Sequence, residues 1–232
     1  MLIELQGVTS FYGSTPILHG IDLSVKKGEC VCVLGRNGVG KTTLIRTIMG
    51  LTTRVNGKIS ILGKDVEGIP THERSLAGLG YIPQGRHIIG NFTIEENILL
   101  GTFARSDRKR VVPDICRELF PYLAANLDKK AGQLSGGQQQ QLAIARALAT
   151  DPTIILLDEP TEGIQPNIVQ EIEEMLMRLN REMGLTMILT EQHIKAARSL
   201  AHEFVMMDRG RIVERGKIEN LTNDVIEGHL SL

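Results

Sequence analysis

The chain has 232 residues, 42% of them hydrophobic, and its 26 Lys and Arg nearly balance 27 Asp and Glu, for a net charge of −1. This length suits one large globular domain, with or without a modest inserted lobe. A balanced charge supplies no basic field for nucleic acid or an anionic membrane, so any phosphate chemistry must depend on local groups. The N-terminal segment lacks the pattern of a secretory signal, and no apolar run approaches the ~18 residues that suggest a bilayer span. We therefore expect a soluble, cytosolic protein with no nucleic-acid partner.

The first quarter of the chain alternates apolar and polar residues as antiparallel strands do, with glycines between the runs. These runs are 2–13, 17–29 and, later, 57–66. Residues 30–35, CVCVLG, form a continuous apolar segment typical of a strand buried on both faces of a parallel sheet. Its cysteines have no further Cys or His at ligand spacing, so they are predicted to be core residues rather than zinc ligands. A helix is expected from about Gly40.

After a short strand at 80–84 the pattern becomes helical. The predicted helical segments are 93–101, 108–120 and 135–150, and Pro113 is expected near a helix start within the second. The last third alternates strand and helix. Its predicted elements are a strand at 153–159, a helix at 167–182, a strand at 185–191, a helix to about 201 and hairpin strands at 204–208 and 211–216. The amphipathic pattern of the helix at 167–182 predicts that it buries Ile168, Ile172, Met175, Leu176 and Leu179.

These elements predict an α/β fold in one domain, 1–232. Strand–helix alternation at both ends indicates a nucleotide-type core with a parallel sheet, formed by 1–84 and 151–232, and an N-terminal antiparallel β subdomain joins this core. The helical segment 85–150 would be an inserted lobe.

The segment GRNGVGKT, Gly35 to Thr42, fits the phosphate-loop pattern G-x-x-x-x-G-K-[ST] and lies between a predicted buried strand and a helix. Glycines let consecutive backbone N–H groups face phosphate oxygens, and the helix N-terminus adds partial positive charge. Lys41 would bind the β- and γ-phosphates, and the Thr42 hydroxyl would ligate Mg²⁺. A glycine-rich turn is the alternative, but the context favours a nucleoside triphosphate site. The predicted nucleotide contacts are Gly35, Arg36, Asn37, Gly38, Val39, Gly40, Lys41, Thr42 and Thr43.

Asp158 and Glu159 end the apolar run IILLDE, at the strand edge that faces the ligand in a parallel sheet. Asp158 would hold Mg²⁺ through water, and Glu159 would orient or deprotonate the water that attacks the γ-phosphate. Acidic residues that merely end a strand in solvent are the alternative. That alternative is common for a single carboxylate, but it is a weaker explanation for two adjacent carboxylates in a chain that also has a phosphate loop.

LSGGQ, Leu134 to Gln138, opens a predicted helix. Ser135 suits the N-cap position, and the two glycines expose the first N–H groups. From the residues alone, an ordinary N-cap is the favoured interpretation.

The phosphate loop, LSGGQ and ILLDEP occur in the order and spacing of ATP-binding cassette (ABC) ATPases, which the chain resembles over nearly its whole length. The resemblance implies an ATPase that uses ATP and Mg²⁺ and works as a head-to-tail dimer around two nucleotides. The signature residues of one subunit would contact the γ-phosphate bound by the other. These signature residues are Ser135, Gly136, Gly137 and Gln138.

The resemblance assigns roles to two more residues. Tyr12 matches the aromatic that stacks on adenine, with an ordinary strand aromatic as the alternative. Gln84 matches the glutamine that reaches Mg²⁺ and the attacking water, with a loop residue after Pro83 as the alternative.

Two segments depart from the family pattern. The family usually carries a histidine that touches the γ-phosphate, just after the strand that follows the carboxylate pair. Counting back from SLAHEF, Ser199 to Phe204, places Gln192 in that position and His193 one position beyond. An amide can donate to a phosphate oxygen but cannot carry a proton, so Glu159 is the main candidate for activating water. The segment 161–166, TEGIQP, has Gln165 where an aspartate is usual.

The chain looks most like the ATPase of an importer for urea or short-chain amides, with a branched-chain amino acid importer as the alternative. The implied partners are membrane permease subunits, a second ATPase that is identical or related, and, indirectly, a solute-binding protein. The subunit would lie peripherally at the cytoplasmic face of the membrane, where Ile88 and Ile89 would help to accept the permease; local packing of this pair is the alternative. A cytosolic ABC protein without a transport role and a nucleotide sensor without hydrolysis are the rival classes.

Overall fold

An antiparallel sheet forms from the N-terminal strands, as predicted. The structure, a computed structural model, describes residues 1–230. The sheet has the order β2-β1-β4-β5. Its strands are β1 (Ile3–Tyr12), β2 (Thr15–Val25), β4 (Arg54–Ile61) and β5 (Lys64–Asp65).

A second sheet of six strands has the order β10-β9-β3-β8-β7-β6. Its strands are β3 (Cys30–Leu34), β6 (Leu79–Ile82), β7 (Ile154–Asp158), β8 (Thr186–Glu191), β9 (Glu203–Asp208) and β10 (Arg211–Lys217). The strands from β9 through β6 pair in parallel, and β10 alone pairs antiparallel with its neighbour β9. Because parallel strands end at one edge, the residues that follow β3, β7 and β8 meet there.

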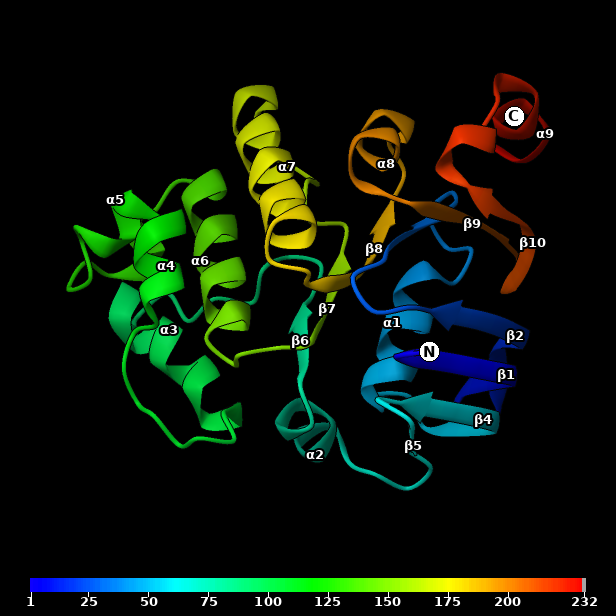
Figure 1. The fold of residues 1–232 in the computed structure, drawn as a ribbon, viewed down its shortest axis with the longest axis horizontal. Helices are drawn as coiled ribbons and strands as arrows, with labels where there is room; N and C mark the ends of the chain where they lie inside the picture. Colours follow the sequence, from blue (N-terminus) through cyan, green and yellow to red (C-terminus); the bar gives the residue numbers. More distant parts are fainter. Residues whose placement is uncertain (231–232) are drawn as a thin grey trace.

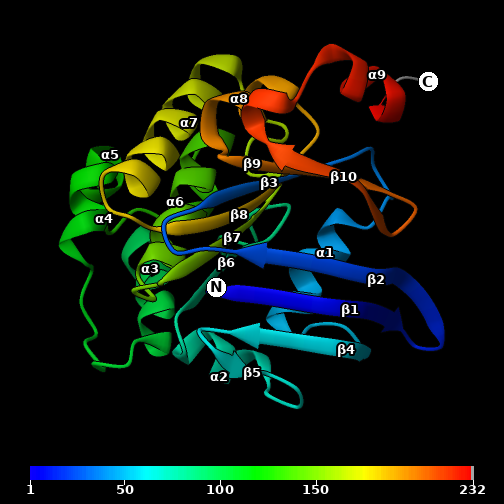
Figure 2. The same cartoon turned by 45° about the vertical axis from the view of Figure 1, so that its right-hand side comes forward.

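Helix α1 (Lys41–Met49) lies between the two sheets, which Figure 2 shows stacked one above the other. Its buried Leu44, Ile45 and Ile48 share one hydrophobic core with the antiparallel sheet and with Val31 and Val33 of β3. The alternate β3 residues, Cys30, Cys32 and Leu34, face the opposite core, as the two-residue period of a strand requires.

The opposite face of the parallel sheet is covered by α7 (Pro166–Arg181) and α8 (Ile194–Leu200). In α7, Ile172, Leu176 and Leu179 are buried as predicted. Ile168 and Met175 are only partly buried, which corrects their assignment to the core. Ile168 lies at the start of the helix, where it packs against Gly137.

Helix α2 (Thr71–Leu76) precedes β6. The segment between β6 and β7 supplies the helices at the left of Figure 1. Their bounds are α3 (Ile94–Gly101), η1 (Thr102–Ala104), α4 (Asp114–Leu119), α5 (Pro121–Ala124), η2 (Ala131–Gln133) and α6 (Gly136–Leu148). Capping boxes begin both α3, at Thr93, and α6, at Ser135. The apolar residues of these helices join the core under α7, so the helical segment shares a continuous core with the parallel sheet.

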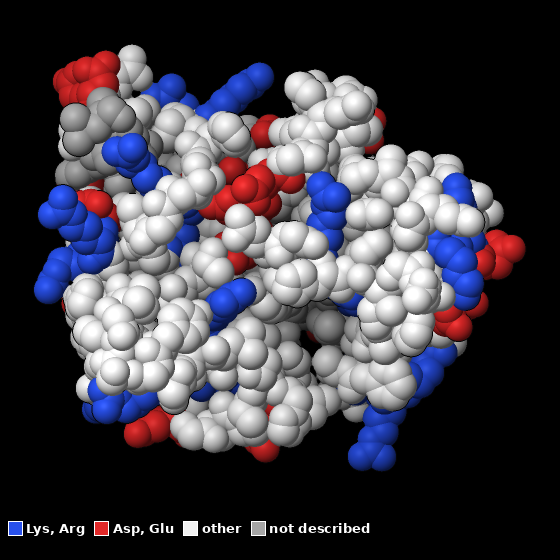
Figure 3. Space-filling view, turned by 180° about the vertical axis from the view of Figure 1, so that it is seen from behind, with Lys and Arg blue, Asp and Glu red and all other residues white. Residues whose placement is uncertain are grey.

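The chain continues past β10 through η3 (Ile218–Asn220) to α9 (Asn223–Leu230). Among the described residues, no helix has the length and apolar character to cross a membrane. The face drawn in Figure 3 carries basic and acidic side chains in small separate groups, with wide uncharged areas between them.

Candidate active site

The phosphate loop lies between the end of β3 and the start of α1, in the context predicted from the sequence. Gly40 precedes α1 at φ 111°, and no side chain caps the helix, so its first N–H groups are left for a ligand. Gly35 cannot be replaced without strain, because a Cβ there would lie 2.7 Å from the carbonyl oxygen of Met207. The backbone N–H of Gly210 donates to the Val39 carbonyl at 2.8 Å and anchors the loop to the β9–β10 turn.

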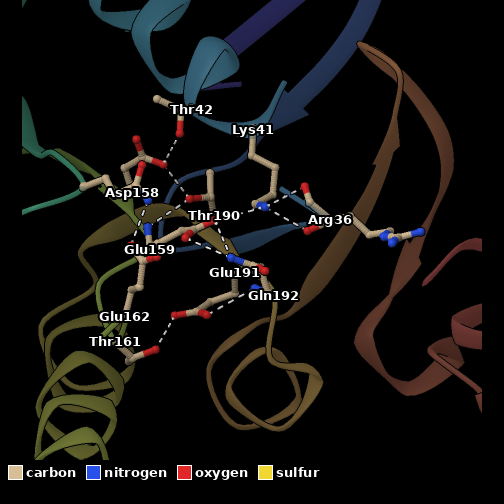
Figure 4. Close-up of polar contacts among 12 residues, drawn as sticks. Arg36, Lys41, Thr42, Asp158, Glu159, Thr161, Glu162, Thr190, Glu191 and Gln192 are labelled. Carbon is tan, nitrogen blue, oxygen red and sulfur yellow. Dashed lines mark hydrogen bonds and ion pairs between the residues drawn. The ribbon is translucent and has the colours of Figure 1, made fainter. Parts of the chain in front are cut away.

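Lys41 is buried at the base of this loop, with only 4% of its surface exposed. Its Nζ donates to the carbonyl oxygens of Gly35 at 2.8 Å and Arg36 at 3.1 Å. The same Nζ forms an ion pair with Glu159 Oε1 at 3.0 Å. Figure 4 shows that Arg36 offers its backbone here while its side chain extends away from the carboxylates. The lysine charge is therefore balanced within the chain by the carboxylate predicted to activate water.

Asp158 lies at the end of β7 and is 1% exposed. Its Oδ1 accepts hydrogen bonds from the hydroxyls of Thr42 at 3.0 Å and Thr190 at 2.8 Å. Its Oδ2 is buried and has no hydrogen-bond partner. Burial raises the pKa of this carboxyl, because water is removed from its charged form.

The Thr42–Asp158 pair fits Mg²⁺. A buried carboxylate oxygen without a partner beside a hydroxyl provides the hard oxygen ligands that this ion prefers. No group of three or more His, Cys, Asp or Glu residues in the described part of the chain could hold a metal ion. Mg²⁺ usually has only a few protein ligands, because it retains bound waters and also binds the phosphates of the substrate.

Glu159 follows Asp158 with φ 48°, a left-handed conformation that is uncommon for a residue with a Cβ. Its backbone N–H donates to Thr190 Oγ1 at 3.0 Å, which holds this conformation. Its carboxylate accepts the side-chain amide of Gln192 at 3.2 and 3.1 Å (Figure 4). Unusual backbone conformations of this kind cluster at functional sites.

His193, by contrast, lies at the N-cap position of α8 and is exposed. It lines a groove beside α7 with residues such as Asn167 and Lys195. The structure thus places the side chain of Gln192, rather than that of His193, against Glu159. The contact of Gln192 with the γ-phosphate, expected from its position in the sequence, stays a prediction.

Gln84 follows β6 and joins the phosphate loop and Glu159 around one cavity of about 290 Å³. The lining residues are Ile17, Asn37, Gly38, Gly40, Lys41, Thr42, Thr43, Gln84 and Glu159. The Gln84 amide donates to Glu162 Oε2 at 2.8 Å, in the loop before α7. Sequence reasoning missed Ile17 and Thr190, and no local motif marks either residue.

Tyr12, the predicted adenine-stacking residue, is the last residue of β1 and is 37% exposed. It does not line the cavity. The interaction of its hydroxyl with the side chain of Arg46 on α1 is the main cause that raises the pKa of Arg46, because it favours the charged guanidinium. The structure therefore places Tyr12 beside α1, the helix that follows the phosphate loop.

The signature residues lie at the start of α6, where Ser135 and Gly136 are exposed, Gln138 is partly exposed and Gly137 is buried. Ser135 Oγ accepts from the backbone N–H of Gln138 at 3.3 Å, and the Gln138 side chain accepts from the Ser135 N–H at 3.0 Å. None of the four signature residues lines the cavity that the phosphate loop forms with Gln84 and Glu159, here called the phosphate cavity.

Comparison with known proteins connects this geometry to a family. The family model described as ABC transporter matches residues 18–162. The chain is 38% identical, over 91% of both chains, to the high-affinity branched-chain amino acid transport ATP-binding protein BraG of Pseudomonas aeruginosa. It is 33% identical to the probable branched-chain amino acid transport ATP-binding protein LivF of Archaeoglobus fulgidus, over 90% of this chain and 89% of that one.

A dimeric post-hydrolysis structure of an ATP-binding cassette bound to ADP and Pi superposes with a TM-score of 0.82. It is 29% identical and covers 93% of this chain and 98% of that one. The described fold, with its antiparallel β subdomain beside the parallel sheet, is that of an ABC ATPase. The protein therefore belongs to the ABC transporter family and is one of its ATP-binding, ATP-hydrolysing cassettes.

Proposed function

We propose that this chain is the ATPase subunit of an importer for branched-chain amino acids. The supporting observation is that the branched-chain relatives match over about nine tenths of both chains. A methionine import relative from Rhizobium etli is 35% identical, but this chain spans only 61% of its length. These findings favour the branched-chain class over urea or short-chain amides, the class that the sequence alone favoured.

In the proposed reaction, the Gly35–Thr43 loop holds the phosphates of ATP. Thr42 and Asp158 would hold Mg²⁺, which neutralises charge on the phosphate oxygens when bound. Lys41 would bind the terminal phosphates and so leave its ion pair with Glu159, since both partners compete for one ammonium group. The released Glu159 carboxylate would then accept a proton from the attacking water.

Gln192 and Gln84 would position groups rather than transfer protons, because an amide does neither acid nor base chemistry. Gln192 already holds both oxygens of Glu159 and would keep that carboxylate turned toward the phosphate. Gln84 would leave Glu162 to reach Mg²⁺ and the attacking water.

The proposed assembly contains a second ATPase subunit and membrane permease subunits. The start of α6 lies outside the phosphate cavity of its own chain, which fits a role at the nucleotide of a partner. The subunit would bind the permease at the cytoplasmic face of the membrane, and a solute-binding protein would act indirectly. Ile89 is 39% exposed and available for such a contact, whereas Ile88 packs against the core.

Transport in reconstituted vesicles tests this function. The chain would be co-purified with the membrane proteins that it binds and reconstituted with ATP inside the vesicles. Uptake of labelled leucine and of labelled urea would then be compared. We expect ATP-dependent leucine uptake that is lost in a Glu159→Gln complex of the same composition. Uptake of urea but not leucine would contradict the proposed substrate class, and absence of any permease from the complex would contradict the transport role.

A further inference from the structure

Glu191, the last residue of β8, is a third carboxyl beside the site and has no role in the reaction described above. It is 2% exposed and does not line the phosphate cavity. Its Oε1 accepts the Thr161 hydroxyl at 2.8 Å, and its Oε2 accepts the backbone N–H of Gln192 at 3.3 Å. Figure 4 shows these contacts on the side of Glu159 away from Thr42.

A buried carboxyl at this place is costly to the fold. Removing a carboxylate from water is unfavourable unless hydrogen bonds compensate. Here burial raises the pKa of Glu191, and the hydrogen bonds from the Thr161 hydroxyl and the Gln192 N–H oppose that rise without cancelling it. An apolar side chain would end the buried strand β8 without that penalty, so packing alone does not account for a carboxyl here.

The two partners of Glu191 belong to loops that follow neighbouring strands. Thr161 is 5% exposed and lies in the loop after β7, two residues beyond Glu159. Gln192 follows β8, and its side chain holds the Glu159 carboxylate. β7 and β8 are paired in register up to Asp158 and Thr190, after which no strand pairing joins them. Glu191 supplies a connection where the sheet ends.

We propose that Glu191 is a positioning residue that joins the Thr161 loop to Gln192 and thereby holds Glu159 in its working orientation. The inference depends on the proposed roles of Glu159 and Gln192 in hydrolysis. The connection runs from Thr161 through Glu191 and Gln192 to Glu159, and breaking it changes the orientation of the general base rather than the grip on ATP.

A double-mutant cycle tests the connection. The variants are Thr161→Val, which keeps the shape of the side chain but removes the hydroxyl, Glu191→Leu, which removes both acceptors, and the combination of the two. Thr161→Ser is the matched control, because it keeps the hydroxyl. For each purified variant, kcat and KM for ATP would be measured together with the Kd of a fluorescent ATP analogue bound with Mg²⁺.

We expect each single substitution to lower kcat about tenfold with KM and Kd changed by less than about threefold, the pattern of a lost contribution to the transition state. The double variant should be no slower than the slower single variant, since residues of one network are not additive. Thr161→Ser should retain most of the turnover. A product of the two single effects in the double variant, or wild-type kcat in Thr161→Val, would overturn the proposal.

Two comparisons keep the result interpretable. If Glu191→Leu does not fold, the kcat values of Thr161→Val and Thr161→Ser decide the role of Glu191. Both variants keep a small side chain at this place, but only Thr161→Ser keeps the hydroxyl that Glu191 accepts. Glu159→Gln separates this inference from the proposed mechanism. An active Glu159→Gln enzyme contradicts the mechanism itself, whereas an inactive one beside a normal Thr161→Val enzyme contradicts only the role of Glu191.

Discussion

Gln192 donates its side-chain amide to both carboxylate oxygens of Glu159, at 3.2 and 3.1 Å. A histidine in that position could take up or give a proton near neutral pH, but glutamine cannot. The contact therefore orients Glu159 without sharing its proton chemistry. In the proposed mechanism, the capacity to activate water therefore rests on the Glu159 carboxylate alone.

Glu159→Gln should lower ATP turnover by about a hundredfold or more, because general-base catalysis contributes about 10² to 10⁴ in rate. The Lys41 contacts to Gly35 and Arg36 remain, so Mg-ATP binding should be retained. Phosphate release and equilibrium nucleotide binding would be measured on the same preparation. Wild-type turnover in this variant would contradict the assignment of Glu159 as the base.

Gln192→Ala and His193→Ala test which of the two residues after β8 supports ATP hydrolysis. Removing the Gln192 amide frees the Glu159 carboxylate to rotate, so we expect about a tenfold lower kcat, while His193→Ala should leave appreciable turnover because that side chain lies in the groove beside α7. Steady-state ATPase assays check both variants. The reverse order of sensitivity would assign the γ-phosphate contact to His193 instead.

Glu162→Ala should raise kcat/KM for ATP by about two- to fivefold. The increase is small because the hydrogen bond that is lost, to an exposed carboxylate, contributes little in water. The substitution removes the acceptor that holds Gln84 at 2.8 Å and leaves the glutamine free for the nucleotide site. Glu162→Gln, which keeps an acceptor oxygen, is the control and should stay closer to the wild type. A lower kcat/KM in Glu162→Ala would show that Glu162 assists catalysis.

Gly101→Ala should destabilise the protein, although alanine usually stabilises a helix by about 1 kcal/mol relative to glycine. A Cβ at the end of α3 would lie 2.0 Å from the carbonyl oxygen of Arg146 on α6. The helices must separate to admit it, at a cost of about 1–3 kcal/mol. Urea unfolding checks the free energy, and Gly228→Ala in α9, where nothing lies within 4 Å, is the control expected to be neutral or stabilising.

The three cysteines should resist alkylation while the protein is folded. Cys30, Cys32 and Cys116 are all buried, and burial raises the pKa of Cys30 and Cys116 to about 12. The thiolate is the reactive form, so at about pH 8 only about one thiol in ten thousand would be ionised even if reagent reached it. Labelling with iodoacetamide should stay slow and rise with pH without a plateau below 12. Rapid labelling of the folded protein near neutral pH would contradict this burial.

The sequence by itself determined the parts of this protein that are written in consecutive residues. The phosphate loop, the Asp158–Glu159 pair and the Ser135 helix start each combine a local motif with the strand or helix beside it, so their elements could be predicted. Hydrophobic periods likewise predicted the strands and most of the helices, because a period of two or 3.6 residues reports which face is buried.

Only the tertiary structure decided which distant residues meet. Thr190 supports both Asp158 and Glu159 because β7 and β8 pair in register, and Thr161 reaches Glu191 because two loops leave that edge together. The overlap that an added Cβ would cause at Gly101 comes from the close approach of two helices. The partial exposure of Ile168 comes from its place at the start of a helix. Periodicity assigns a residue to a face of its own element, whereas contacts between elements depend on strand register and helix packing, which single-chain patterns do not encode.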